Sequence, residues 1–267
     1  MKKRNRFGIF TLVLILSLCG CTQDKIPISS SSDVQKEQDT LPEAEITPEE
    51  EPFLYGYQNL NEEEKTRYRQ ILAGIENYED SVTVEVCSEE EINKVSNLVF
   101  VDHPEIFWLE QQNYSFNQKE NSDVDLLELN LVYNMGKDEI EDTKQQIEAK
   151  AEEWSQELSN CENEYDKIKY VYEFLGKNVL YDSESENNQN IQSVFLNQST
   201  VCMGFAKATQ YLLVRNGIFC TLVTGKVIPE NMEHAWNLVR IGENYYYVDT
   251  TWSSSGFVPE EDRIQDF

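Results

Sequence analysis

One stretch of the sequence limits the fold more than any other: a helix pattern followed by three strand patterns near the C-terminal end. Residues 199–213 favour a helix that Ser199 or Thr200 can cap and that Asn216-Gly217 stops. A tight turn at 242–244 joins the last two of three strand patterns, which cover residues 220–227, 234–241 and 245–251. A helix that leads into an antiparallel sheet predicts an α+β architecture.

Residues 1–21 have the features of an export signal. Four Lys and Arg residues within the first six positions precede an apolar stretch at 7–18, which is too short to span a bilayer comfortably. The stretch ends in Leu18-Cys19-Gly20-Cys21, which resembles a bacterial lipobox in which Cys21 is acylated and becomes the new N-terminus. Acylation of Cys21 would supply more than one acyl chain and hence a stable membrane anchor. A plain cleaved signal or an uncleaved anchor is the alternative.

The sequence after the signal divides into three further parts. Residues 22–52 are rich in Ser, Pro and acidic residues and nearly lack large apolar ones, so we expect a disordered linker. Order is expected to begin near Phe53. Strand and helix patterns at 53–160 predict a small α+β domain without visible chemistry, followed by a second domain at 161–267. Helix starts are indicated by two pairs, Asn61 with Glu64 and Ser88 with Glu91.

Composition excludes several classes of function. Lys and Arg number 22 against 49 Asp and Glu, a formal net charge of −27. Nucleic-acid binding needs cationic side chains at the phosphates, so we exclude it. The chain has two His and no Cys cluster, so we expect neither a metal site nor a cofactor. A Cys87–Cys161 bridge has no support in the spacing, and the cysteines beyond the signal are expected to be separate thiols, namely Cys87, Cys161, Cys202 and Cys220.

Three residues in the C-terminal part can form a catalytic group. Cys202 falls in the first turn of the predicted helix, where exposed N–H groups and the positive end of the helix dipole favour a thiolate. His234 opens a strand, and the hairpin count places Asp249 within a residue or two of the position opposite it. His103, in a turn-like Asp-His-Pro-Glu segment, is better explained by a structural role. The sequence thus predicts a triad of Cys202, His234 and Asp249.

These residues lie in segments that resemble the three motifs of the transglutaminase-like superfamily. The segments are Thr200 to Ala206 (TVCMGFA), His234 to Asn237 (HAWN) and Tyr247 to Trp252 (YVDTTW). Thr200 and Met203 stand where family members often carry Gly and Gln. Residues 102–108 and the preceding helix look like the N-terminal extension of exported lipoproteins of this superfamily from Gram-positive bacteria. The end of the chain at Phe267, soon after the Asp motif, is typical of a truncated member.

The resemblance implies a papain-like fold and acyl transfer through a thioester on Cys202. His234 would carry the proton, and Asp249 would hold the imidazole tautomer. The backbone N–H of Cys202 and a side chain of either Tyr181 or Trp236 would meet the oxyanion. We expect a transglutaminase, deamidase or peptidase that acts on protein or cell-wall peptide at the outer face of a bacterial membrane. A non-catalytic binding module that keeps the fold is the alternative.

Overall fold

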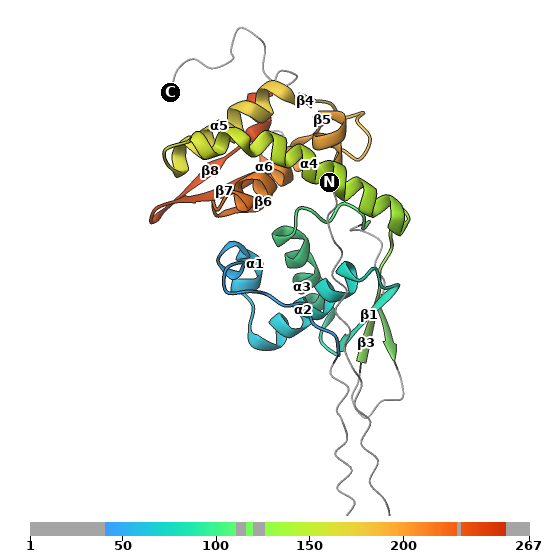
Figure 1. The fold of residues 1–267 in the computed structure, drawn as a ribbon. Coiled ribbons are helices and arrows are strands. Elements are labelled where there is room, and N and C mark those ends of the chain that lie inside the picture. The colour runs from blue at the N-terminus through green and yellow to red at the C-terminus, as the bar shows by residue number, and fades with distance from the viewer. Residues whose placement is uncertain (1–40, 111–115, 120–125, 229–230, 255–267) are drawn as a thin grey trace, which may run out of the picture. The chain divides into compact units, whose positions relative to one another are not determined.

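The computed structural model describes residues 41–110, 116–119, 126–228 and 231–254, which belong to one compact unit (Figure 1). The export signal, Cys21 and residues 22–40 lie outside the described residues. Within the described ranges, no helix combines the length and the apolar character that a membrane crossing requires.

The N-terminal half combines three helices with a small sheet. The helices are α1 (Tyr55–Gln58), α2 (Glu62–Glu76) and α3 (Glu89–Asp102), and a short 3₁₀ turn, η1 (Glu51–Phe53), precedes them. Strands β1 (Ser81–Glu85), β2 (Phe116–Lys119) and β3 (Leu126–Asn130) form an antiparallel sheet in the order β1-β3-β2.

Both predicted helix starts are confirmed. Asn61 caps α2 in a reciprocal capping box, since its side chain accepts from the Glu64 N–H at 3.0 Å while the Glu64 carboxylate accepts from the Asn61 N–H at 2.9 Å. The Ser88 hydroxyl accepts from the Glu91 N–H at the start of α3. These short polar pairs satisfy N–H groups that the helix itself leaves without a partner.

The predicted linker is wrong over residues 41–52. The Ala44 N–H donates to the Arg69 carbonyl at 2.9 Å, and Ala44 is buried. Arg69 also holds the Glu43 carboxylate at 2.7 Å. The Thr47 N–H and hydroxyl both bond to the Glu50 carboxylate before η1 begins. A few specific polar contacts to α2 thus fix a segment whose own apolar content is low, and order begins before Phe53.

Two long helices connect the halves of the chain. Helix α4 (Lys137–Ser155) continues into a 3₁₀ segment, η2 (Gln156–Asn160), and α5 (Glu164–Asn178) follows. One hydrophobic cluster includes buried side chains from both halves, among them Tyr68 and Val99 from the first and Leu175 and Leu213 from the second. The Gln210 side chain also donates to the Val101 carbonyl at 2.7 Å. The proposed domain boundary after residue 160 stays a prediction.

The C-terminal half carries the α+β arrangement expected from the sequence. Helix α6 (Cys202–Arg215) packs on a three-stranded antiparallel sheet in the order β6-β7-β8, and Figure 1 shows it beside these strands. The strands are β6 (Cys220–Val227), β7 (Met232–Ile241) and β8 (Asn244–Val248). Smaller elements complete this half, namely β4 (Leu180–Tyr181), the one-turn helix η3 (Ser193–Asn197), β5 (Ser199–Thr200) and η4 (Thr250–Ser253).

Two local predictions in this half are corrected. Ser199 and Thr200 do not cap α6, because they pair with Leu180 and Tyr181 as a short parallel ladder, and Val201 stands at the N-cap without a side-chain bond. The last strand ends at Val248 and not at Thr251, because Asp249 turns the chain into η4.

Candidate active site

Cys202 is the first residue of α6, as the sequence predicts, and it is half-buried. Three backbone N–H groups, those of Ala235, Met203 and Cys202 itself, lie near enough to the thiol to lower its pKa. Ala235 follows His234 on β7. The helix start and the strand therefore bring the candidate nucleophile and the candidate base to one place.

The expected thiolate is not the favoured state of Cys202. Burial raises the pKa of its thiol and outweighs the three N–H groups, which lower the pKa, while the nearby Asp249 carboxylate raises it further. The sequence argument considered the helix dipole but could not see the burial. The raised pKa favours the neutral thiol, whose proton must leave during the attack.

His234 and Asp249 form a hydrogen-bonded pair. The imidazole Nε2 lies 2.7 Å from the Asp249 Oδ2, and the histidine side chain is 6% exposed. A carboxylate can only accept, so Nε2 carries the proton in the neutral ring and Nδ1 keeps its lone pair. This tautomer provides a base at Nδ1.

Asp249 is held from both sides. Its second oxygen, Oδ1, accepts from the Thr251 N–H at 3.2 Å. The following η4 is fixed to α5 through Ser253, whose hydroxyl donates to the Tyr172 carbonyl, and to α6 through a bond of 2.8 Å between the Thr209 and Thr250 hydroxyls. The strand register gives the approximate position of Asp249, and these contacts fix its direction.

Two buried polar side chains next to the site, those of Asn237 and Ser254, were not predicted from the sequence. The Asn237 amide is buried between β7 and α6, where it donates to the Ala206 carbonyl at 2.9 Å. The Ser254 hydroxyl donates to the Val179 carbonyl and accepts from the Tyr181 N–H. Asn237 belongs to the HAWN segment, and its apolar neighbours on β7 could have marked it as a buried polar residue.

Aromatic rings surround the His–Asp pair. Trp236 stacks on the His234 ring with centroids 5.8 Å apart, and Trp252 meets it edge-on at 6.2 Å. Tyr181 on β4 is a further aromatic residue near Cys202. Burial raises the pKa of its phenol, and the nearby Cys202 side chain raises it further. Tyr181 thus stays a neutral donor at physiological pH.

His103 lies outside this group. It is the C-cap residue of α3, and its Nδ1 pairs with Glu105 at 2.8 Å. Cys87, Cys161, Cys202 and Cys220 are free thiols, as expected. Among the described residues, no three His, Cys, Asp or Glu side chains gather in a way that could hold a metal ion.

Residues 152–250 match the family model of the transglutaminase-like superfamily, which supports a transglutaminase-like domain over these residues. The match spans all three site residues. It also supports a cysteine-based catalytic family for this part of the chain, and the architecture around it is mixed α+β.

Three known proteins show what the chain is similar to. Kyphoscoliosis peptidase of Mus musculus is 22% identical over 112 residues, which cover 36% of this chain and 17% of that protein. A solved structure of a TGase is 17% identical, with a TM-score of 0.39 over 70% of this chain and 53% of the other. The periplasmic domain of TgpA from Pseudomonas aeruginosa is 11% identical, with a TM-score of 0.33 over 66% and 69% of the two chains.

Proposed function

We propose that the protein is a thiol enzyme that transfers or hydrolyses the acyl group of protein or peptide carboxamides through a thioester on Cys202. The observation that carries the proposal is the 2.7 Å bond between His234 and Asp249, next to a thiol at the start of α6. Surface contacts between a His and an Asp are common, but this pair is largely buried beside a nucleophile and surrounded by aromatic rings.

The raised pKa of Cys202 decides the order of proton transfers. As the sulfur attacks the carboxamide carbon, its proton passes to Nδ1 of His234, and Asp249 stabilises the imidazolium that results. The C–N bond then breaks, and the leaving amine or ammonia takes that proton. Water or an amine attacks the thioester, gives its proton to His234, and the returning proton restores the Cys202 thiol.

The oxyanion needs two donors. The backbone N–H of Cys202 at the helix start is one. Of the two side chains considered from the sequence, the Tyr181 hydroxyl fits better, because Cys202 is near enough to affect the pKa of the phenol while the Trp236 ring stacks on His234. We assign the second donor to Tyr181.

The proposal includes the place of the enzyme. Cys21 would be acylated and would anchor the protein on the outer face of a bacterial membrane, in the manner of exported Gram-positive lipoproteins. The lipobox-like segment supports this part of the proposal. At that surface the substrate would be a protein or a cell-wall peptide.

Incubation with glutamine-containing peptides tests the chemistry. Release of ammonia alone indicates deamidation, incorporation of an added primary amine indicates transglutamination, and a new N-terminus indicates proteolysis. Cys202→Ala should abolish all three and remove the acyl-enzyme mass seen after rapid quenching. A wild-type protein that binds such peptides, forms no thioester and converts none of them would be a binding module instead.

A further inference from the structure

A pocket of about 550 Å³ opens beside the nucleophile helix. Met203 and Lys207 of α6 form one wall. The rest is formed by the polar loop 187–190 together with Ile106, Phe107, Leu109, Glu110 and Asn134. Met203 directly follows Cys202, and its N–H lies near the thiol. Residues four apart share a helix face, so Lys207 extends this wall away from the thiol. Pockets of this volume hold small ligands or one to two peptide side chains.

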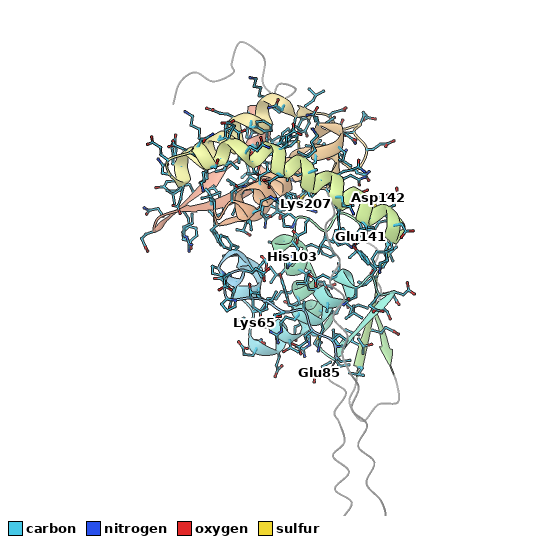
Figure 2. The ribbon with its side chains drawn as sticks, viewed as in Figure 1. Lys65, Glu85, His103, Glu141, Asp142 and Lys207 are labelled. Carbon is cyan, nitrogen blue, oxygen red and sulfur yellow. The ribbon has the colours of Figure 1, made fainter. Side chains whose placement is uncertain are left out.

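Lys207 is the unusual group in this pocket. The side chain is labelled in Figure 2, it lines the pocket, and Lys207 is only 3% exposed. No hydrogen bond or ion pair among the described residues involves its ammonium group. Burial lowers the pKa of Lys207 to about 8, and no other group contributes. Buried lysines normally have an anionic partner, because an unpaired buried charge is costly.

Glu110 does not supply that partner. It is the other ionisable residue among the described ones that line the pocket. A carboxylate in contact with the ammonium would raise the pKa of Lys207, whereas burial alone sets it. The remaining polar wall consists of neutral amides, Asn134 and the side chains of loop 187–190. One cation among amide donors is suited to a ligand with a single carboxylate.

The loop that closes the pocket is fixed in place. The Thr200 hydroxyl donates to the Asn188 carbonyl at 2.9 Å and accepts from the Ser193 hydroxyl at 2.7 Å. The Thr200 side chain packs against Gly204 of α6, since a Cβ added to Gly204 would approach the Thr200 Oγ1 to 1.9 Å. Because residue 204 is a glycine, the Thr200 side chain, which holds loop 187–190, can lie against the first turn of α6. The pocket is therefore formed before a ligand arrives.

We infer that this pocket is a substrate subsite in which Lys207 binds a carboxylate of a peptide, either an acidic side chain or a free α-carboxylate, next to the carboxamide that Cys202 attacks. The inference rests on the proposed function for the role of the bound peptide, but the binding itself does not need turnover. The subsite would make the enzyme prefer substrates that carry a negative charge close to the reactive amide.

The net charge of −27 does not prevent such binding. At physiological ionic strength charges beyond a Debye length of ~8 Å are largely screened, whereas a buried ammonium acts on a bound carboxylate at contact distance. Excess acid elsewhere slows the approach of anionic peptides, and the local cation decides the affinity.

The binding can be measured with three small probes on the full-length Cys202→Ala protein, which cannot turn over substrate. N-acetylglutamate α-amide carries a side-chain carboxylate, N-acetylglutamine carries an α-carboxylate, and N-acetylglutamine amide is neutral. In protein with [ε-¹³C]lysine, the NMR titration midpoint of Lys207 should rise with at least one carboxylate probe and stay unchanged with the neutral one. The probe that shifts the midpoint shows whether the site binds a side-chain carboxylate or an α-carboxylate.

Two variants complete the test. Lys207→Met should weaken binding of the active probe by about tenfold to a hundredfold, while Lys177→Met, which removes an exposed lysine of α5, should not change it. In wild-type protein the affinity should fall by about tenfold per pH unit above pH 8, as the free ammonium loses its proton. The same peptides in a turnover assay should show a lower KM with the carboxylate than with the amide, and Lys207→Met should remove that difference.

The outcomes separate the two proposals. If neither carboxylate probe moves the Lys207 midpoint, the subsite inference is wrong even when the enzyme converts glutamine peptides. If the midpoint shifts but no peptide is converted by the wild type, the carboxylate site stands and the proposed acyl transfer does not.

Discussion

The hydroxyl of Thr209 on α6 lies 2.8 Å from the hydroxyl of Thr250, the residue that follows Asp249. Both side chains are at most 2% exposed, and the Thr209 hydroxyl also donates to the Phe205 carbonyl. This contact joins the helix of the candidate nucleophile to the segment of the candidate carboxylate. A small error in the packing of α6 would therefore move Asp249 as well.

Thr250→Val should lower the free energy of unfolding by about 1–2 kcal/mol, because it replaces a buried hydroxyl and takes one partner from Thr209. Thr209→Val should cost a similar amount. The double variant should cost less than the sum, since it leaves neither hydroxyl unpaired. Urea unfolding of the four proteins gives the coupling energy, and strictly additive losses would show that the two hydroxyls do not interact.

Asp249→Asn should leave the melting temperature nearly unchanged and reduce turnover by about 10³–10⁴-fold. An amide can donate to Nε2 and so favours the tautomer that has its proton on Nδ1, the atom needed as the base. Melting temperature and turnover should be measured on the same preparation. Turnover within a few-fold of wild type would leave at most a Cys202–His234 dyad.

The Cys202 thiol should react with iodoacetamide slowly at neutral pH. Since burial raises its pKa, the thiolate fraction is small at pH 7, and the rate should increase about tenfold per pH unit to beyond the ordinary cysteine pKa of ~8.5. Mass spectrometry of the alkylated Cys202 peptide from pH 6 to 10.5 gives the midpoint. A plateau that is already reached below pH 7 would show a preformed thiolate, as the helix position alone suggests.

Lys207→Met should make the protein more stable at pH 7. The buried ammonium has a folded-state pKa of about 8, below its value in the unfolded chain. Below pH 8 the charged lysine therefore lowers the free energy of unfolding by its full amount. The cost decreases as pH rises toward ~10.4, where the lysine is neutral in both states. We expect a gain of about 3 kcal/mol at pH 7 that disappears above pH 10. Unfolding curves of both proteins at pH 7, 8.5 and 10 test this, and a constant difference would contradict it.

Gly204→Ala should destabilise the protein, because the new Cβ would approach the Thr200 Oγ1 and push the Thr200 side chain away from α6. Gly136→Ala is the matched control, since a Cβ there meets nothing within 4 Å. We expect a loss of about 1–3 kcal/mol at Gly204 and a change within ~0.5 kcal/mol at Gly136. Equal melting temperatures of the two variants would mean that the close approach at Gly204 is not needed.

Local sequence signals predicted the elements well where a few neighbouring residues decide the outcome. The capping pairs at Asn61 and Ser88 define the starts of α2 and α3, and the alternation before and after Gly242 predicts the hairpin of β7 and β8. The hairpin register in turn places Asp249 near His234 without any tertiary information, because strand pairing converts sequence distance into position.

Features that depend on distant partners could not be predicted in this way. The order of residues 41–52 depends on Arg69, and the raised pKa of Cys202 depends on burial by several elements. Thr200 has the residue type of a helix cap, but its hydroxyl bonds to Asn188 and Ser193 instead. Only the packed structure shows that Lys207 is buried and lines a pocket.

The bond between the Tyr181 N–H and the Ser254 hydroxyl closes a loop of 73 residues around the site. A ribosome completes α6 long before it reaches His234, Asp249 and Ser254. The thiol is therefore made first, and its base, its carboxylate and the contact that holds the proposed oxyanion donor are added in turn. Long-range closure of this kind is slow compared with helix formation. We expect the growing chain to lack activity until Ser254 has been synthesised, which would protect the machinery that makes it.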